Sequence, residues 1–371
     1  MPPEIVYRVS MSADLSRHLS LLRHRASIVA AIRAFFDRRG YLAVETPQLC
    51  RTPIPEAHIE LFETHRDHPA LGTTEPLWLL PSPEYYLKRL LAAGAGNLYE
   101  ITRSFRNGEE IGPVHDIEFT MLEYYTVDAN SEDSLIITRE LLQELGESAA
   151  PLVLPMREAW SRFTGIDLAA TLPSGSAAQG RGAGIPGGGA PGADRAAHPE
   201  SAESPAPPTI PGSAAPDRQA LEAAIQRANL SLSISPEDSW EDLFQRVFLT
   251  YIEPDLPQDR PVFITDYPAA VSTLARTTPG TPWADRWELY LGGVEVANCF
   301  GEETNPRRIA AFFAEQNAEK AAVGHRVHPV QQDYLHSPEL PRCSGVAMGI
   351  DRLVMHLVGA TDLGEVVSFQ P

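Results

Sequence analysis

A dense run of charged residues lies inside a segment, 103–125, whose apolar pattern predicts a β-hairpin. Arg106 stands where the first strand meets the loop, Glu109 and His115 belong to the loop, and Glu123 falls within the second strand. A guanidinium at such a position could bind a phosphate through two parallel hydrogen bonds. A carboxylate on an apolar strand face is costly unless a cation pairs with it. Together these residues favour a binding site over a solvated edge hairpin.

Strand geometry sorts the side chains of the second strand. Residues two apart share a face, whereas neighbours point to opposite faces. One face is therefore expected to combine an aromatic ring, a carboxylate and a phenol, and the other to be mostly apolar. The first set is Phe119, Met121, Glu123 and Tyr125, and the second is Glu118, Thr120, Leu122 and Tyr124.

A second cluster follows two further predicted strands, 287–291 and 294–300, which a Gly-Gly turn joins. Glu295 and Glu302 are 302 − 295 = 7 positions apart. An odd offset places them on opposite faces of a regular strand, so both reach one site only if the chain bends, and we expect Gly301 to allow that bend. Paired carboxylates of this kind suit Mg²⁺ that also binds nucleotide phosphates, although surface glutamates are common.

Small residues recur at every second position of a third segment, at Gly345, Ala347 and Gly349. They predict a strand with one flat face, against which a planar ring could lie. Asp351 and Arg352 then begin an apolar helix, and an arginine at the positive end of a helix dipole suits a triphosphate. Close packing of strands, with Asp351 as a helix cap, remains the alternative.

The elements that position these residues follow from periodicity and from chain breakers. An amphipathic helix is predicted at 16–39 before Gly40, then a short strand at 41–47. Residues 77–94 predict a strand, a break at two prolines and a helix. Residues 170–216 contain mainly Ala, Gly, Pro and Ser and predict a disordered insertion. Further helices are expected at 132–146, 218–229, 240–251 and 306–322, and residues 261–371 otherwise alternate strands before a final strand and helix.

Composition narrows the classes of protein. The 371 residues, 43% of them hydrophobic, can bury a large core, and the net charge of −19 disfavours tight, non-specific binding of nucleic acid. Cys50, Cys299 and Cys343 lack the paired spacing of a zinc site and predict free thiols in a reducing compartment. No signal peptide or membrane span is recognisable, so a cytoplasmic location is expected.

Three segments, GYLAVETP, FRNGEEIGPVHDIEFTMLEYY and GVAMGIDRL, resemble in order and spacing the three motifs of class II aminoacyl-tRNA synthetases. Within that class, SPEYYLKRL and FTMLEYY resemble the lysyl branch. The resemblance implies an α+β fold, an antiparallel β-sheet flanked by helices. It divides the catalytic domain into 16–169 and 217–371, with the insertion at 170–216 between them. Gly108, an extra residue in the second motif, and Asp116, in place of the usual asparagine, depart from the pattern.

The resemblance also implies roles for individual residues. Arg106 and Arg352 would be catalytic and would bind ATP, with Phe119 and Arg352 on either side of adenine. The other expected ATP-binding residues are Asn107, Glu109, His115, Asp116, Glu295, Val296 and Gly349. The amino acid would be bound by Ser82, Pro83, Glu84, Glu123, Tyr125, Glu302 and Ala347, and Mg²⁺ by Glu295 and Glu302.

About twenty residues precede the first motif, too few for the anticodon-binding barrel of lysyl-tRNA synthetases. In this respect, and in Ser82 and Ala347, the chain resembles the bacterial lysyl-tRNA synthetase paralogues that modify elongation factor P. The resemblance implies ATP and Mg²⁺, lysine or (R)-β-lysine as substrate, elongation factor P as acceptor, and a homodimer. A tRNA acceptor is disfavoured. A minimal lysyl-tRNA synthetase and a non-catalytic regulatory paralogue remain alternatives.

Overall fold

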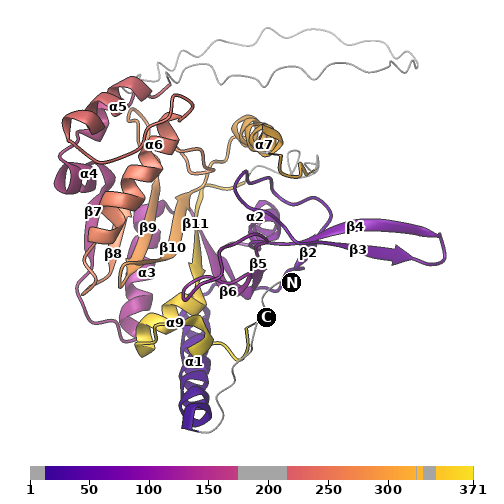
Figure 1. Ribbon diagram of the computed structural model, residues 1–371. Helices are drawn as coiled ribbons and strands as arrows, with labels where there is room; N and C mark the ends of the chain where they lie inside the picture. Colours follow the sequence, from indigo (N-terminus) through magenta and orange to yellow (C-terminus); the bar gives the residue numbers. More distant parts are fainter. Residues whose placement is uncertain (1–12, 174–214, 323, 329–339, 371) are drawn as a thin grey trace, which may run out of the picture.

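The computed structural model describes residues 13–173, 215–322, 324–328 and 340–370, which form two sheets and the helices around them (Figure 1). The main sheet has eight strands in the order β1-β5-β6-β11-β10-β9-β8-β7, and a small sheet has the order β2-β4-β3. The predicted α+β architecture is confirmed. The main sheet is antiparallel except at its two ends, where β1 pairs with β5 and β7 with β8 in parallel.

The sheet strands are short at the edges and longest at the centre. In sheet order they are β1 (Leu42–Ala43), β5 (Leu98–Phe105), β6 (Glu118–Val127), β11 (Cys343–Gly349), β10 (Val294–Gly301), β9 (Arg286–Leu291), β8 (Val262–Thr265) and β7 (Leu152–Pro155). The small sheet consists of β2 (Leu49–Cys50), β4 (Thr73–Leu79) and β3 (Glu63–His68). The last two form an arm that extends away from the main sheet (Figure 1).

Helices cover one face of the central strands. Apolar residues of α1 (Ala13–Arg38), α3 (Ser131–Glu144) and α9 (Ile350–Val358) share a buried core with Leu122, Tyr124 and Val346 of the sheet. Leu122 and Tyr124 belong to the strand face that was predicted to be mostly apolar. Because α1, α3 and α9 occupy this face, the opposite face of β6, β11 and β10 is available for a cavity.

A second core surrounds β7 and β8. It is built by α4 (Met156–Thr164), α5 (Arg218–Arg227) and α6 (Trp240–Val247), with the π-helical turn η2 (Phe248–Ile252) after α6. The ring of Phe244 stacks with those of Trp160 and Trp240, and its centroid lies 5.3 Å from each of theirs. Aromatic stacking of this kind adds to the burial of apolar area and fixes α4 against α6.

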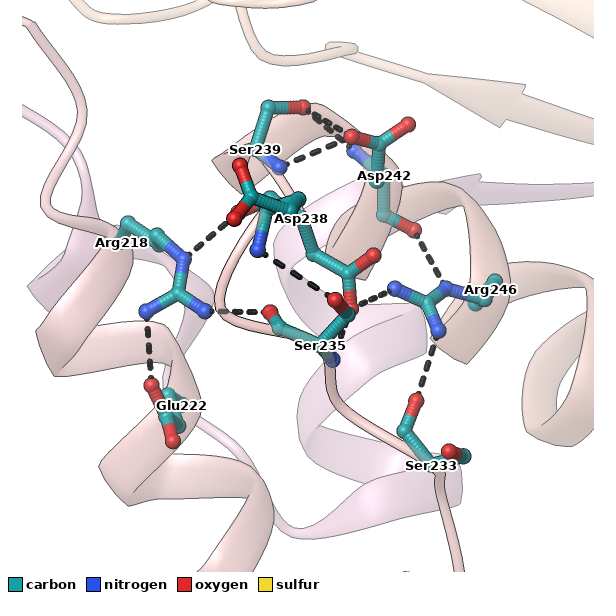
Figure 2. Close-up of polar contacts among 9 residues, drawn as sticks. Arg218, Glu222, Ser233, Ser235, Asp238, Ser239, Asp242 and Arg246 are labelled. Atoms are coloured by element: carbon teal, nitrogen blue, oxygen red, sulfur yellow. Dashed lines mark hydrogen bonds and ion pairs between the residues drawn. The ribbon is translucent and has the colours of Figure 1, made fainter.

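Two arginines fix the irregular connection between α5 and α6 (Figure 2). Arg218 donates to the carbonyl oxygens of Asp238 and Ser235, at 2.6 and 2.9 Å. Arg246 donates to the carbonyl of Ser233 at 2.6 Å and forms an ion pair with the Asp238 carboxylate. We call Arg218, Ser233, Ser235, Asp238 and Arg246 the connection cluster. Its guanidinium groups satisfy carbonyls that have no partner strand or helix.

The structure describes both ends of the stretch 170–216 that was predicted to be a disordered insertion. Residues 174–214 lie outside the described residues, so the predicted disorder is not tested there. Thr171 and Leu172, which the prediction placed in the disordered stretch, are buried. The amide of Asp217 donates to the carbonyl of Thr171 at 2.8 Å. The two described ends that flank residues 174–214 therefore lie next to each other.

Most predicted helices are confirmed, with shifts of a few residues at their ends. They include α2 (Glu84–Ala92) and α7 (Pro306–Ala322), besides those above. The strand predicted at 41–47 is reduced to the two residues of β1, because Pro47 and its neighbours leave the sheet. The arm strand β3 was not foreseen, since its charged residues lack apolar alternation. In the described part of the chain, no helix is long and apolar enough to cross a membrane.

Candidate active site

A cavity of about 420 Å³ opens on the free face of the central strands. All four residues of the mixed face of β6 line it, as strand parity predicted: Phe119, Met121, Glu123 and Tyr125. Their partners across the sheet continue the floor, because directly paired residues of neighbouring strands share a face. Ala347 is paired with both Glu123 and Asn298, and Gly345 with both Tyr125 and Phe300.

The small residues of β11 leave room for the side chains beside them. A Cβ atom on Gly345 would lie 2.4 Å from Cε1 of Tyr125 and 2.5 Å from Oε1 of Glu302. Both distances are far below van der Waals contact, so this position requires glycine. The flat face predicted for β11 is thus the part of the cavity floor between Glu123 and Asn298.

Glu295 and Glu302 both line the cavity, although the irregularity that allows this is not at Gly301. The β9–β10 register shifts between Glu295 and Ala297. One extra residue there reverses the parity of the strand, so the seven-residue offset ends on one face. Gly301 is needed for another reason, since a Cβ atom on it would lie 1.9 Å from Oδ2 of Asp285.

Three charged residues meet at one end of the cavity. The Lys88 ammonium lies 2.6 Å from Oε1 of Glu84 on the same helix and 2.7 Å from Oε2 of Glu302. Lys88 is buried, and Glu302 is 2% exposed. Burial raises the pKa of Glu302 to about 7 despite Lys88, and Glu84 acts in the same direction. The Lys88 ammonium thus pairs with the carboxylates of both Glu84 and Glu302, and its single positive charge offsets only part of their negative charge.

Glu123 lies deeper, next to Tyr125. The Tyr125 hydroxyl donates to Oε1 of Glu123 at 2.7 Å, while Oε2 is buried without a hydrogen-bond partner among the described residues. Burial, reinforced by Glu84, raises the pKa of Glu123 well above its usual value. A buried carboxyl oxygen that lacks a partner is expected to bind a donor on a ligand, preferably a cationic one.

Sequence reasoning missed three residues of this end: Lys88, Glu56 and Asn298. Glu56 lies in the loop before β3, lines the cavity, and has its pKa raised to about 7 by burial and by Glu84. Asn298 lies beside Ala347 on β10. Asn298 is a polar residue within a mostly apolar strand, and this could have marked it as a candidate site residue. The proline-rich loop around Glu56 offered none.

The other end of the cavity is basic. Arg106 lies with its guanidinium carbon 5.2 Å from the ring centroid of Phe119, and its Nη1 is 3.7 Å from Oε1 of Glu109. Arg352 is held by two backbone carbonyls, since Nε donates to Val114 at 2.9 Å and Nη1 to Glu295 at 2.8 Å. Two guanidinium groups and an aromatic ring thus line this end of the cavity, and they are the residues to which the resemblance assigned phosphate and adenine.

The remaining predicted residues fall in two groups. Glu109, His115, Asp116, Val296, Gly349 and Ser82 line the cavity. Burial and Arg352 lower the pKa of His115, which favours the neutral form of its imidazole. Asn107 and Pro83 are not among the lining residues. The amide of Asn107 donates to the carbonyl of Glu60 at 2.9 Å, and Pro83 precedes the first turn of α2.

One comparison with known proteins decides the family. The model of the tRNA synthetases class II (D, K and N) matches residues 7–371, which is nearly the whole chain. The chain belongs to the class II tRNA synthetases of the D, K and N type. The domain is therefore that of an ATP-dependent, amino-acid-activating ligase, and the family in general uses ATP and Mg²⁺.

The residues that could hold Mg²⁺ in this synthetase domain are not equivalent. No group of three or more His, Cys, Asp or Glu side chains in the described segments is placed to bind a metal on its own. Mg²⁺ needs only one or two carboxylates when substrate phosphates complete its shell. Glu295 fits that role, because burial and Glu288 raise its pKa to about 7 and a cation would relieve this. Glu302 already has Lys88 beside it.

Proposed function

We propose that this chain activates lysine or (R)-β-lysine with ATP and transfers it to a lysine side chain of elongation factor P. The observation that carries the proposal is the imbalance of charge at the acidic end of the cavity. Four glutamates line that end, and the Lys88 ammonium contacts two of them. Within the described residues Glu56 and Glu123 take part in no ion pair. A substrate with two ammonium groups would supply the missing positive charge.

The expected orientation of the substrate follows from how deeply each binding residue lies in the cavity. Glu123 and Tyr125 are buried at the floor, so they suit the distal ammonium of the side chain. Glu84 is nearer the opening and suits the amino group close to the carboxyl. Glu56 would contact that second amino group as well, because it lines the same end of the cavity and its pKa is raised by burial and by the nearby charge of Glu84. Ala347 keeps the floor between Glu123 and Asn298 low enough for the alkyl chain.

Catalysis in this proposal consists of positioning and electrostatics. The substrate carboxylate attacks the α-phosphorus of ATP, a P–O bond forms, and pyrophosphate leaves. Arg106 would stabilise the charge on the α-phosphate, and Arg352 would bind the γ-phosphate and face the adenine ring opposite Phe119. Mg²⁺ on Glu295 would neutralise phosphate charge when bound. The amine of the acceptor then attacks the aminoacyl-adenylate and releases AMP.

Charge favours a protein acceptor over tRNA. The chain carries a net charge of −19, which repels a polyanion at long range. A protein with a basic loop around its target lysine would be attracted by the same field, and its association rate would fall as salt rises.

The test is a pyrophosphate-exchange assay with lysine, (R)-β-lysine and (S)-β-lysine, followed by the mass of elongation factor P after incubation with ATP. We expect exchange with a lysine isomer and a gain of one lysyl residue in the factor. Efficient charging of tRNA-Lys with no change in the mass of the factor would replace this proposal by a minimal lysyl-tRNA synthetase. An absence of exchange with every isomer would favour the non-catalytic paralogue.

A homodimer is part of the same proposal. Exposed leucines on α1 and β1, the elements of the first motif, support a self-complementary interface: Leu15, Leu19 and Leu42. Sedimentation at micromolar concentration is expected to give twice the mass of the chain. A monomer under those conditions would contradict the dimer without touching the proposed reaction.

A further inference from the structure

Arg25 on α1 joins three elements of the fold through its guanidinium group. Its Nη2 donates to Oγ1 of Thr120 on β6 at 2.8 Å and lies 2.5 Å from Oδ1 of Asp351 on α9. The Arg25 side chain is 15% exposed and that of Asp351 is 5% exposed. This is a largely buried ion pair between residues far apart in sequence, and it lies outside the set of residues that the family resemblance assigned to binding.

Asp351 uses its second oxygen to extend the hydrogen bonding of the sheet. The last pair between β6 and β11 joins Met121 to Gly349. The amide of Thr120, one residue beyond that pair, donates to Oδ2 of Asp351 at 2.7 Å. Asp351 is therefore no helix cap, the alternative that the sequence left open. The N-cap of α9 is Gly349, which makes no side-chain capping bond.

The position of this tie gives it a consequence for the basic end of the cavity. Thr120 directly follows Phe119, and Asp351 directly precedes Arg352. The Asp351 carboxylate thus sets the spacing between the strand that carries the ring and the helical turn that carries the guanidinium. A ligand group held between Phe119 and Arg352 depends on that spacing.

We propose that Arg25 is a positioning residue for the nucleotide half of the site. It does not line the cavity, and it acts by balancing the buried carboxylate of Asp351. Without Arg25 the carboxylate would be buried beside Arg352, the neighbouring cation. It would then draw the Arg352 guanidinium away from the carbonyls of Val114 and Glu295. The inference rests on the proposed function, because it takes the basic end of the cavity to be the ATP site.

The test compares binding of α,β-methylene-ATP with Mg²⁺, by calorimetry, to the wild-type chain and to Arg25→Gln, Arg25→Lys and Arg17→Gln. Arg17 is the matched control, since it lies on the same helix and forms an exposed ion pair with Glu365 at 2.8 Å. We expect Arg25→Gln to weaken binding about tenfold, which corresponds to about 1.4 kcal/mol. Arg25→Lys is expected to lie between that variant and the wild type, and Arg17→Gln within about twofold of the wild type.

A second readout separates positioning from general stability. In pyrophosphate exchange, Arg25→Gln is expected to raise the KM for ATP by about the same factor and to leave the KM for lysine within about twofold. The double variant Arg25→Gln with Asp351→Asn keeps an amide oxygen for Thr120 but removes the unpaired charge. It is expected to recover part of the ATP affinity, which a purely structural role of Arg25 would not produce.

Each outcome either supports or overturns the positioning role of Arg25. Unchanged ATP affinity in a folded Arg25→Gln variant, or equal losses for ATP and lysine, would overturn the inference while leaving the proposed function intact. If Arg25→Gln does not fold, wild-type ATP affinity in Arg25→Lys overturns the inference, and a selective loss for ATP supports it. A wild-type chain that fails to bind α,β-methylene-ATP would overturn the proposed function and this inference with it.

Discussion

Two clusters of charge in this molecule differ in how their charges are balanced. In the connection cluster, Arg218 and Arg246 bind backbone carbonyls and the Asp238 carboxylate, and hydrogen bonds from Arg246 and Ser235 lower the pKa of Asp238 (Figure 2). In the cavity, burial raises the pKa of Glu56 and Glu123. A cluster that is balanced within the chain stabilises the fold. A cluster that is left with excess charge inside a cavity is prepared for a ligand.

The largest effect is expected from Glu123→Gln. Loss of the carboxylate leaves the distal ammonium of the substrate buried without its partner, which costs about 3 to 5 kcal/mol of lysine activation. The folded apo protein already disfavours the charged form of Glu123, so the melting temperature is not expected to fall. Pyrophosphate exchange and thermal unfolding measure the two effects. Near wild-type activation in this variant would remove Glu123 from the substrate site.

The reverse pattern is expected for Arg246→Gln. The variant loses the donor to the Ser233 carbonyl and the ion pair with Asp238, so the melting temperature should fall by about 2 °C or more. Pyrophosphate exchange at a temperature well below unfolding should not change. Arg260→Gln is the matched control, because Arg260 is exposed and pairs with the adjacent Asp259. Equal melting temperatures for both variants would show that the connection cluster contributes no more than a surface pair.

The pH dependence of stability gives a smaller effect with a definite sign. The pKa of Glu56 is raised to about 7 in the folded chain, from the ordinary value of 4.5. Between these values the folded state binds more protons than the unfolded state, so this group's contribution is present at low pH and is lost as pH rises through about 7. The wild type should therefore lose stability relative to Glu56→Gln as pH rises across this window. A constant difference between their melting temperatures would contradict the shifted pKa.

The smallest effect is expected from deleting residues 174–214. The hydrogen bond from Asp217 to Thr171 already brings the two ends of this segment together. Loop-closure entropy varies slowly with length, so a short Gly-Ser link should shift the melting temperature by only about 2 °C and leave pyrophosphate exchange unchanged. A large decrease would mean that the segment contributes to the core around α5 and α6.

The sequence predicted those parts of the site whose side chains follow the regular alternation of a strand. The face of β6 with Glu123 and Tyr125 followed from alternation alone, because the strand is regular from end to end. The shift at Glu295 could not be predicted, since one extra residue in a strand leaves no repeated pattern. Lys88 was missed because a lysine four residues after a glutamate on a helix is typical of an exposed surface pair. Its burial depends on Glu302, which is distant in sequence.

The roles expected for the residues at the basic end of the cavity came from the family resemblance and not from a repeating sequence pattern. Arg106 and Arg352 can be recognised in the sequence as charged residues near predicted strand and helix ends, but no local pattern indicates that they line the same cavity. The contact of Arg25 with Asp351 is of the same kind, because it joins the first and last α-helices of the described chain. Such contacts are fixed by the order of the strands, and that order is a property of the whole fold.

The arm formed by β3 and β4 has a consequence for behaviour in concentrated solution. β3 is one of the two edge strands of the small sheet, so the backbone groups on its outer side have no strand partner in the described structure. An open edge of this kind is a template for strands of other molecules. The exposed side chains along β3 carry both signs of charge, Glu63, Arg66 and Asp67 among them. Covering them would remove these charges from water, so the arm can extend from the protein without seeding aggregation.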